Sequence, residues 1–403
     1  MGKIENFLVP KSIAVIGGSE HPGKVGGVLM NKLLAFRGNI IPVNIEHEII
    51  FGKKSYKSVL DYPEKIDLAI IAIPAKGVRG VLVECGKKGV KNVIIISAGF
   101  SEVGDKKSED ELIKIGKEYG MNILGPNCFG ITNPFINLDT TFSNLSAKKG
   151  DIAFISQSGA LWSYIADVSF STSNHGFSAF VSLGNMAGLE FSDFIEYFNN
   201  DEKTRKIILY IEKLKDGRKF LEACKKSKKE IIAIKAGKTK KGSEATVSHT
   251  GSLATDFEIY KGVFRQAGIK TENSFSSAFG IKRKEINPKG KKITIITNAG
   301  GAAALMTDYL IEKGYDVHLP IDLLGTARAE DYKNAFNNLK NSDTDSVVVI
   351  LTPQTMSEPE KTAEEIVKFS KFKDITAVFL GRDSVKKAEE ILKKNKIPCF
   401  TDI

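Results

Sequence analysis

The hydrophobic pattern of the chain opens with a short run of apolar and β-branched residues, Ser12–Ile16, which predicts a buried strand. A glycine-rich stretch, residues 17–26, follows this strand, and an amphipathic pattern then predicts a helix through about Phe36. Further apolar runs predict strands at Asn39–Val43, Asp67–Ile73, Asn92–Ser97 and Asn122–Leu124. Continuous apolar strands that alternate with helices indicate a parallel sheet covered on both faces.

The same order of strand, glycine-rich turn and helix begins again near Asp151 and a third time at Lys291. In the second unit, strands are predicted at Ile152–Ile155, Ala179–Ser182, Ile207–Ile211 and Ile231–Lys235, with a helix from Leu161 to about Ser169. In the third unit, strands are predicted at Ile293–Thr297, Val347–Leu351 and Ala377–Leu380, with helices at Pro359–Ser370 and Ser384–Lys394. Two polar segments, 139–150 and 285–290, separate the units. We therefore predict an α/β protein with three domains, residues 1–138, 148–284 and 291–403.

Composition narrows the classes of function. The 403 residues are 42% apolar and 26% charged, which is typical of a globular protein with a large core. No apolar run approaches the length of a bilayer-spanning helix, and the first residues lack the apolar stretch of a signal peptide. The four cysteines lie far apart without metal-ligand spacing. We expect a cytoplasmic protein with reduced thiols, no membrane segment and no metal site.

The net charge of +10 raises the question of a polyanionic partner. Its lysines are dispersed over predicted helix surfaces, without a basic run interleaved with aromatic residues and without a nucleic-acid-reading motif. We therefore expect no nucleic-acid partner. The charge favours small polyanions as ligands.

Three loops at predicted helix entries have the composition of anion-binding turns: Gly17-Gly18-Ser19, Ser156-Gln-Ser-Gly159 and Asn298-Ala-Gly-Gly301. Small residues let backbone N–H groups approach a phosphate, and the helix N-terminus adds partial positive charge. The first loop is neither a GxGxxG fingerprint nor a Walker loop, and by itself it is equally consistent with a structural turn. For the second loop taken by itself, an ordinary N-cap is the favoured interpretation. Three such loops together favour an anionic substrate.

His249 is one of only five histidines, and it lies among small hydroxyl and glycine residues after the lysine-rich stretch 235–242. An imidazole nitrogen accepts a phosphoryl group near neutral pH, and small neighbours allow a phosphate to approach it. The alternative is an idle surface-loop histidine near a helix start. Both interpretations remain open from this segment alone.

Glu212 follows the predicted strand Ile207–Ile211, so its carboxylate is expected at the ligand-binding edge of a parallel sheet. There it can orient His249 and stabilise the charged or phosphorylated ring. The alternative is a solvated strand-end glutamate. His21 and His47 lie in polar segments of predicted loops, and they are weaker candidates than His249 for a functional histidine.

Two further histidines and one cysteine have no predicted catalytic role. His175 and His318 are interpreted as structural. Cys128 has no evident base partner, and we do not predict a nucleophile there.

Taken together, the motifs resemble the α subunit of the ADP-forming acyl-CoA synthetases of the acetate–CoA ligase type, relatives of succinate–CoA ligase α. The resemblance covers essentially the whole chain. In the first unit it rests on Ser12-Ile-Ala-Val-Ile-Gly-Gly-Ser19, Ile41-Pro-Val-Asn44, Asp67-Leu-Ala-Ile-Ile-Ala-Ile-Pro-Ala75, Ser97-Ala-Gly-Phe-Ser-Glu102 and Gly125-Pro-Asn-Cys-Phe-Gly130. In the later units it rests on Ser156-Gln-Ser-Gly-Ala160, Ser182-Leu-Gly-Asn185, Tyr210-Ile-Glu212, Lys235-Ala-Gly-Lys238, Ser248-His-Thr-Gly-Ser-Leu-Ala254, Thr297-Asn-Ala-Gly-Gly301 and Thr352-Pro-Gln354.

The resemblance implies a Rossmann-like CoA-binding domain followed by two flavodoxin-like domains with parallel sheets. It implies that phosphate attacks an acyl-CoA thioester, that the histidine takes the phosphoryl group from the acyl phosphate, and that ADP receives it. The family's catalytic pair corresponds to His249 and Glu212. The phosphate-facing residues correspond to Ser158, Gly159 and Gly251. The CoA-binding residues correspond to Gly17, Gly18, Ser19, Lys24, Asn44, Pro74, Gly125, Pro126 and Asn127.

The sequence departs from the family pattern in two places near these residues. Ile45 follows Asn44 where the family usually has proline, and Lys213 follows Glu212 where glycine is frequent. No ATP-grasp region is visible, so the resemblance implies that Mg-ADP or Mg-ATP binds to an ATP-grasp β subunit or fused region, in an α2β2 assembly.

Three other functions are considered. A ligase of the same class acting on succinate, branched or aryl acids differs only in the acyl pocket. A non-catalytic CoA-sensing module is disfavoured because His249 and Glu212 are both present. A Rossmann oxidoreductase is disfavoured because GxGxxG and a hydride-handling site are absent from the sequence.

Overall fold

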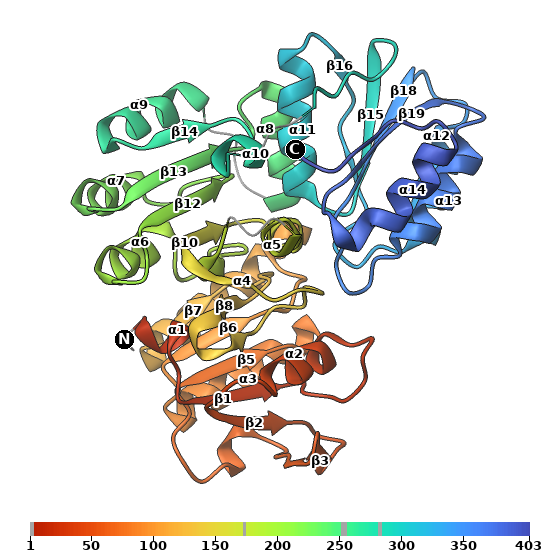
Figure 1. The fold of residues 1–403 in the computed structure, drawn as a ribbon. Coiled ribbons are helices and arrows are strands. Elements are labelled where there is room, and N and C mark those ends of the chain that lie inside the picture. Colours follow the sequence, from red (N-terminus) through yellow and green to blue (C-terminus); the bar gives the residue numbers. More distant parts are fainter. Residues whose placement is uncertain (1–3, 172–174, 251–255, 281–283) are drawn as a thin grey trace.

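Three α/β units, each built on its own sheet, make up the fold in the computed structural model (Figure 1). The structure describes residues 4–171, 175–250, 256–280 and 284–403, with residues 247–250 as backbone only. The predicted fold class is confirmed, and each strand predicted from an apolar run is present within a few residues of its expected bounds. Among the described residues, no helix is both long and apolar enough to cross a membrane.

The first sheet has the strand order β2-β1-β5-β6-β7, with every neighbouring pair parallel. Its strands are β1 (Ser12–Ile16), β2 (Asn39–Val43), β5 (Leu68–Ile71), β6 (Asn92–Ile95) and β7 (Asn122–Leu124). The helices of this unit are α1 (Glu5–Leu8), α2 (Val25–Leu33), α3 (Ala75–Lys88) and α4 (Lys106–Tyr119). A small hairpin, β3 (Ile49–Ile50) and β4 (Lys53–Lys54), and two short 3-10 helices, η1 (Val59–Asp61) and η2 (Ser101–Val103), complete it.

The continuous apolar run of β1 follows from burial on both faces of this sheet. Ile13 and Val15 belong to the core on the α2 side, whereas Ala14 and Ile16 belong to the core that contains residues of α3 and α4. Because successive side chains of a strand point to opposite faces, a strand between two helical layers has no polar face.

The second sheet has the order β14-β13-β12-β10-β11-β8-β9. Its strands are β8 (Ile131–Asn133), β9 (Leu138–Asp139), β10 (Lys149–Ser156), β11 (Phe177–Ser182), β12 (Lys206–Ile211), β13 (Glu230–Lys235) and β14 (Lys270–Glu272). Its helices are α5 (Ala160–Ser171), α6 (Phe191–Asn200), α7 (Gly217–Lys226), α8 (Lys240–Thr250), α9 (Phe257–Ala267) and α10 (Phe275–Ala278).

The structure places β8 and β9 in the second sheet, although the sequence analysis extended the first domain to residue 138. β8 pairs antiparallel with β11, and β9 pairs antiparallel with β8 through the turn η3 (Pro134–Ile136). Lys32 of α2 forms an ion pair with Asp139 at 2.8 Å, so the segment also remains tied to the first unit.

The third sheet has the order β16-β15-β18-β19-β20, with β17 also paired to β15. Its strands are β15 (Lys292–Thr297), β16 (Asp316–Val317), β17 (Ile321–Asp322), β18 (Ser346–Leu351), β19 (Asp374–Phe379) and β20 (Cys399–Phe400). Its helices are α11 (Gly300–Glu312), α12 (Ala329–Leu339), α13 (Pro359–Phe369) and α14 (Lys386–Lys394), with the 3-10 turn η4 (Asp383–Val385).

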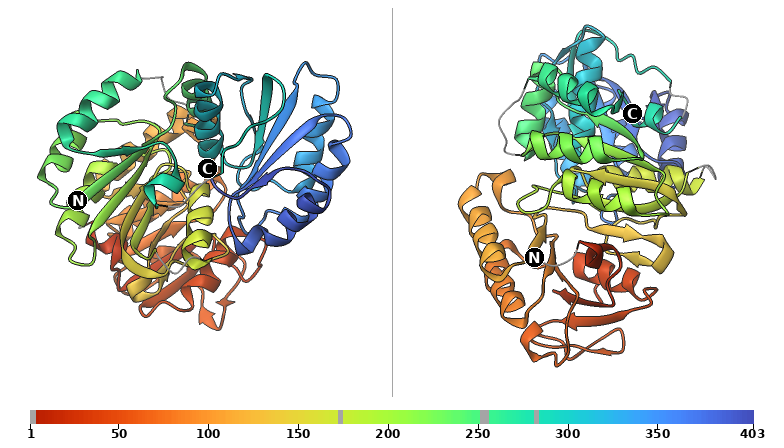
Figure 2. Two further views of the ribbon diagram at one scale, coloured as in Figure 1. Left: turned by 45° about the horizontal axis from the view of Figure 1, so that its top comes forward. Right: turned by 90° about the vertical axis from the view of Figure 1, so that its left-hand side faces the viewer.

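The second and third units share one hydrophobic core. A single cluster of buried side chains includes Trp162 of α5, Tyr210 of β12 and Met306 of α11. Helices α8 and α11 pack along each other between the two sheets (Figures 1 and 2). The fully buried carboxylate of Asp167 on α5 accepts hydrogen bonds from the backbone N–H groups of residues 382–384. The second and third units are therefore packed together through a shared core and buried hydrogen bonds, and are not joined by the connecting chain alone.

Candidate active site

The loop after β1 is a tight turn that only glycine satisfies at its first position. Gly17 has φ of +85°, and a Cβ there would lie 2.5 Å from the carbonyl oxygen of Ala72. The N–H group of Gly17 donates to the carbonyl of Val43, 2.9 Å away. The Asn44 side-chain amide donates to the Gly18 carbonyl at 2.7 Å. The structure thus brings the predicted residues Gly17, Gly18 and Asn44 together at the carboxyl ends of β1 and β2.

Two more predicted residues, Ser19 and Lys24, line the approach to α2. Ser19 is buried, and its hydroxyl accepts the N–H group of His21 at 3.0 Å. His21 Nδ1 in turn accepts the N–H group of Gly23 at 3.0 Å, which gives this histidine a structural role in the turn. Lys24 is the exposed N-cap residue of α2, and no side chain of the described residues caps this helix start. A helix N-terminus beside an exposed lysine suits an anion.

The hairpin β3–β4 adds an open depression beside Asn44 that the sequence analysis did not predict. Residues 44–49 form one side, and the lysines Lys54 and Lys57 line it as well. Ile45 and Ile49 lie on its rim with 78% and 67% of their surface exposed. Exposed apolar side chains next to lysines suit a ligand with a flat ring and phosphate groups. The hairpin was missed because each strand has only two residues.

The other predicted CoA-binding residues lie further along the same sheet edge. Pro74 is the N-cap residue of α3, next to β5. Gly125, Pro126 and Asn127 follow β7, which is separated from β5 by β6, and the bond between Gly125 and Pro126 is cis. The carbonyls of Gly125 and Pro126 accept N–H groups of Ala187 and Asn185. The structure therefore places this turn against the second unit, away from Gly17.

In the second unit, the loop Ser156–Gly159 lies at the carboxyl end of β10, beside the end of β12. Ser158 and Gln157 are both buried. The Gln157 side-chain oxygen accepts the N–H groups of Glu212 and Lys213 at 2.6 and 2.9 Å. Gln157 thus ties the predicted phosphate loop to the predicted histidine-stabilising glutamate, a role that the sequence analysis did not assign.

Other parts of the chain pack closely against the loop Ser156–Gly159. A Cβ on Gly159 would overlap the side chain of Phe129, which lies in the connection between β7 and β8. A Cβ on Gly301, in the first turn of α11, would lie 2.7 Å from Ser158 Oγ and 2.8 Å from the Tyr210 hydroxyl. The Tyr210 hydroxyl donates to the carbonyl of Gly301 at 2.9 Å. Gly301 therefore lets the start of α11 lie close to the loop before α5, and Gly159 leaves room for Phe129.

Two charged side chains are buried next to each other at this edge. Glu212 has 4% of its surface exposed, and so has Lys235 at the end of the neighbouring strand β13. Burial lowers the pKa of Lys235 to about 8, although Asp308 and Glu212 partly counteract this effect. Its ammonium group also lies 4.5 Å from the ring centre of Tyr260. The pKa of Tyr210 is raised well above its usual value by burial and by the Glu212 carboxylate.

His249 lies in the last turn of α8, whereas the sequence analysis expected a loop. Its side chain lies outside the described residues, as does the whole of Gly251. The helix packs along α11 of the third unit and also approaches η2 of the first unit. α8 therefore contacts all three units. The loop was expected because the segment is rich in small hydroxyl residues, which favour caps and turns over helix interiors.

Asp308 on α11 holds the start of α8. Its buried carboxylate accepts the N–H groups of Gly237, Lys238 and Thr239, and the Thr239 hydroxyl, at 2.8 to 2.9 Å. A sequence signal for this contact was absent because the partners are about 70 residues apart.

Comparison with known proteins places this arrangement in a class. The model of a succinyl-CoA ligase-like flavodoxin domain matches residues 149–283, and that of a CoA binding domain matches residues 11–134. The protein thus combines a CoA-binding domain with a flavodoxin domain like that of succinyl-CoA ligase.

Full-length relatives define the family more closely. The chain is 41% identical to the α subunit of acetate–CoA ligase [ADP-forming] II of Pyrococcus furiosus, over 98% of this chain and 94% of that protein. It is 42% identical to the acetate–CoA ligase [ADP-forming] of Methanocaldococcus jannaschii, over 99% of this chain but 61% of that longer protein. The chain belongs to the family of ADP-forming acetate–CoA ligase α subunits, and its relatives are ligases.

A solved structure supports the same assignment. The dinucleotide-forming acetyl-coenzyme A synthetase 1 of Ca. Korarchaeum cryptofilum, in complex with phosphate and ADP, superposes with a TM-score of 0.67. It is 34% identical, and the match covers 100% of this chain and 94% of that one. The subunit name of one relative and the greater length of another indicate that such chains act with a further region, separate or fused.

Proposed function

We propose that this chain is the subunit of an ADP-forming acyl-CoA ligase that binds acyl-CoA and phosphate and carries the phosphoryl group on His249. The overall reaction is acyl-CoA, phosphate and ADP to carboxylic acid, CoA and ATP. The observation that carries the proposal is the position of α8, which contacts all three units while its sheet edge presents Ser158, Gly159 and Glu212. The relatives act on acetate, so we propose acetyl-CoA as the first acyl-CoA to test.

The proposed chemistry has three steps. A phosphate oxygen attacks the thioester carbon, the C–S bond breaks, and the products are acyl phosphate and CoA thiolate. An imidazole nitrogen of His249 then attacks the phosphorus, and the P–O bond to the acyl group breaks to leave a carboxylate. ADP finally attacks the phosphohistidine, which forms ATP and restores the imidazole.

The phosphate is proposed to bind where the starts of α5 and α11 meet. The buried loop at Ser158 and Gly159 supplies small residues at one helix start, and the start of α11 at Gly300 lies beside it. Partial positive charge at helix N-termini stabilises an anion, and a water-poor site strengthens this effect. We propose Gly251, which lies outside the described residues, as a third phosphate-facing residue.

Glu212 is proposed to orient His249 and to stabilise the ring once it carries the phosphoryl group. A buried carboxylate at the end of β12 is suited to this role because its charge is poorly screened by solvent. Lys235, buried beside it, is proposed to offset part of the negative charge of Glu212.

CoA is proposed to bind along the edge of the first sheet. Gly17, Gly18 and Ser19 and the start of α2 form an anion-binding turn, and Lys24 supplies a cation. Asn44 and the depression beside it, with Lys54 and Lys57, suit the nucleotide end of CoA. Pro74 and the turn 125–127 are proposed to flank the path from this edge towards the second unit.

The receiving nucleotide is proposed to bind elsewhere. We propose that Mg-ADP binds to an ATP-grasp β subunit or fused region and that two copies of each subunit assemble as α2β2. We also propose a cytoplasmic location. The free thiols Cys85, Cys128, Cys224 and Cys399 support it, because a reducing compartment preserves them.

A coupled assay tests the proposed function. The chain, with the β partner encoded for it, is incubated with acetyl-CoA, phosphate and ADP, and free thiol and ATP are measured together. We expect equal amounts of both products, no product when phosphate is omitted, and no ATP and no more than a stoichiometric amount of thiol when ADP is omitted. Binding of CoA without any turnover, for acetyl-CoA or for propionyl-, succinyl- and phenylacetyl-CoA, would instead support a non-catalytic CoA-sensing module.

A further inference from the structure

The buried side-chain amide of Gln157 uses only one of its two hydrogen-bonding groups. Gln157 has 3% of its surface exposed and lies between Ser156 and Ser158 in the proposed phosphate loop. Its oxygen accepts the N–H groups of Glu212 and Lys213. Its nitrogen, Nε2, is shielded from solvent and has no hydrogen-bond partner among the described residues. The amide therefore presents a buried donor without an acceptor.

The orientation of this amide is fixed by its partners. The backbone N–H groups of Glu212 and Lys213 can only donate, so the atom that faces them must be the oxygen. Turning the amide over would place its NH2 group against two donors. Buried donors are rarely left unpaired in folded proteins, because the loss of hydrogen bonds with water is then not compensated. An acceptor from outside the chain therefore explains the unpaired nitrogen.

The surroundings of the amide suit an anion as this acceptor. Ser158 and Gly159 lead into α5, and the start of α11 lies against them, since a Cβ on Gly301 would lie 2.7 Å from Ser158 Oγ. Ala299, the N-cap residue of α11, makes no side-chain cap hydrogen bond. Uncapped N–H groups at a helix start attract negative charge. An oxyanion has enough acceptor oxygens to serve both these N–H groups and Nε2.

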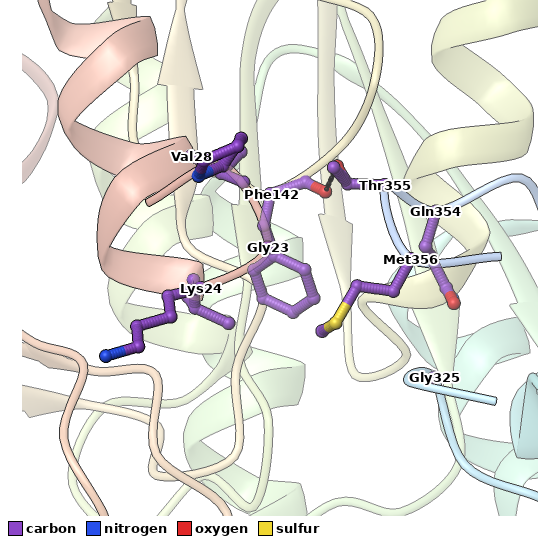
Figure 3. Close-up of a pocket in the computed structure, with 10 residues that line it drawn as sticks. Gly23, Lys24, Val28, Phe142, Gly325, Gln354, Thr355 and Met356 are labelled. Atoms are coloured by element: carbon purple, nitrogen blue, oxygen red, sulfur yellow. Dashed lines mark hydrogen bonds between the residues drawn. The ribbon is translucent and has the colours of Figure 1, made fainter. Parts of the chain in front are cut away.

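Aromatic side chains cover the loop on the side of the connection between β7 and β8. Phe129 packs against Gly159, and its ring centre lies 3.9 Å from that of Phe142. Figure 3 shows Phe142 at a small cleft beside the start of α2, where its carbonyl accepts the Thr355 hydroxyl at 2.7 Å. The aromatic pair thus lies between that cleft and the loop. Protection from water on this side strengthens a hydrogen bond to an anion.

We propose that Gln157 Nε2 donates a hydrogen bond to an oxygen of the phosphate that attacks the acyl-CoA thioester, while the oxygen of the same amide holds the backbone of Glu212. This inference rests on the proposed ligase function and adds a residue to its phosphate site. One side chain then fixes the position of the phosphate relative to the carboxylate that is proposed to orient His249. The contribution of Gln157 is to phosphate binding and not to CoA binding.

Two substitutions remove the donor in different ways. Gln157→Met removes both the donor and the acceptor without adding charge. Gln157→Glu keeps an oxygen for the N–H groups of Glu212 and Lys213, which favour its ionised form, but removes the donor. We expect both variants to raise KM for phosphate by about 10- to 100-fold, the range for loss of a hydrogen bond to a charged group, and to leave KM for acetyl-CoA within about twofold of the wild type. Thiol release in the presence of ADP and the β partner measures both constants.

Asn92→Leu is the matched control. Asn92 is also a buried amide whose oxygen accepts a hydrogen bond, from the Asn122 side chain at 2.9 Å, and whose nitrogen has no partner among the described residues. It lies at the start of β6, however, at the amino end of the first sheet and not in a proposed phosphate loop. We therefore expect the wild-type KM for phosphate in this variant.

The two Gln157 variants separate the possible roles of the side chain. A rise in KM for phosphate with Gln157→Met alone would make the role purely structural, and a rise with Gln157→Glu alone would reflect only the added charge. Either result, or no rise in both variants, would overturn the proposal and leave the ligase function standing. A wild-type protein without phosphate-dependent thiol release would instead contradict the ligase function itself.

The amide can also be observed directly, because the chain contains only three glutamines, Gln157, Gln266 and Gln354. In the full chain labelled with ¹⁵N in its glutamine side chains, the Gln157 resonance is assigned by its absence from Gln157→Glu. We expect this resonance to shift when inorganic phosphate is added, while that of Gln266, on the exposed surface of α9, stays in place. An unchanged Gln157 resonance at a phosphate concentration that saturates turnover would also overturn the proposal.

Discussion

The edge of the first sheet and the junction of the second and third units are both proposed to bind phosphate groups, yet they are built differently. At the first edge the cations and apolar rims are exposed, as Lys24 and Ile45 illustrate. At the junction, Ser158, Glu212 and Lys235 are buried, and neighbouring units pack against their loops. The open edge relies on glycine turns and surface lysines, whereas the junction relies on buried charges and helix starts.

The exposed edge is suited to binding CoA, whereas the buried junction is suited to phosphoryl transfer. An exposed edge binds and releases a large polyanion quickly, and solvent screens its charges. A buried junction strengthens electrostatic interactions with the phosphoryl group and limits access of water. Changes at the junction are therefore expected to have larger effects than a change at the open edge.

The largest effect is expected for Glu212→Gln at the junction. Loss of the carboxylate charge removes the proposed stabilisation of the charged or phosphorylated His249, and we expect the rate of phosphoryl transfer to fall about 10²- to 10³-fold. The rate of phosphoenzyme formation is measured by rapid quench with labelled phosphate. Glu222→Gln, on the exposed surface of α7, is the matched control and should keep the wild-type rate. Equal rates for both variants would refute the role of Glu212.

The second prediction concerns Lys235 and pH. Its pKa is about 8 in the folded protein, below the value of about 10.4 for an unfolded lysine. Between these values the unfolded state binds more protons, so the stability of the folded state rises with pH. Lys235→Met removes this contribution. Between pH 7 and pH 11, the free energy of unfolding of the wild type should therefore rise by roughly 3 kcal/mol more than that of the variant.

The control for this prediction is Lys225→Met, an exposed lysine of α7. Urea unfolding at a series of pH values measures the free energies for the three proteins. The curves for the wild type and the control should run parallel across the whole range. If Lys235→Met also runs parallel to them, burial does not lower the pKa of Lys235 as described.

The third prediction concerns the contact between α11 and the phosphate loop. Gly301→Ala puts a methyl group against Ser158 and Tyr210, and we expect it to destabilise the protein by about 1–3 kcal/mol. In contrast, Gly262→Ala in α9, where a Cβ has open space, should stabilise the protein by up to about 1 kcal/mol. Thermal unfolding measures both changes. Changes in stability of opposite sign would show that Gly301 lacks space for a methyl group, because alanine otherwise favours a helix over glycine at both positions.

The smallest effect is expected at the open edge. Lys24→Ala should raise KM for acetyl-CoA by about three- to fivefold, and added salt should reduce the difference, because an exposed ion pair contributes at most about 1 kcal/mol. Lys65→Ala, an exposed lysine just before β5 at the opposite end of the first sheet, is the control and should leave KM unchanged. A larger fold-change in KM for Lys24→Ala than in the phosphoryl-transfer rate for Glu212→Gln would contradict the expected order of the two regions.

The regular part of the fold could be predicted because long apolar runs and helical periodicity are local signals. β1, β12 and β18 follow directly from such runs. β8 and β9 could not be assigned in the same way. Their five residues have little pattern of their own, and antiparallel pairing to β11 is a tertiary contact that decides where they belong.

The candidate site was predictable only where one residue type has a specific local task. Gly17 could be identified because a turn with positive φ and a close backbone contact requires glycine. Gln157 and Asp308 could not, since each acts on backbone groups distant in sequence. The contact of Thr355 with the Phe142 carbonyl joins the third unit to the segment between β9 and β10, and no local pattern encodes it.

The most direct test of the account is the identity of the residue that carries the phosphoryl group. The chain and its β partner are incubated with acetyl-CoA and labelled phosphate without ADP, and the α chain is analysed for acid-labile, base-stable label. The account predicts label on His249 in the wild type, its discharge on addition of ADP, and no label in His249→Ala, which should still bind CoA. Equal labelling of His249→Ala, or no label in an active wild-type enzyme, would contradict it.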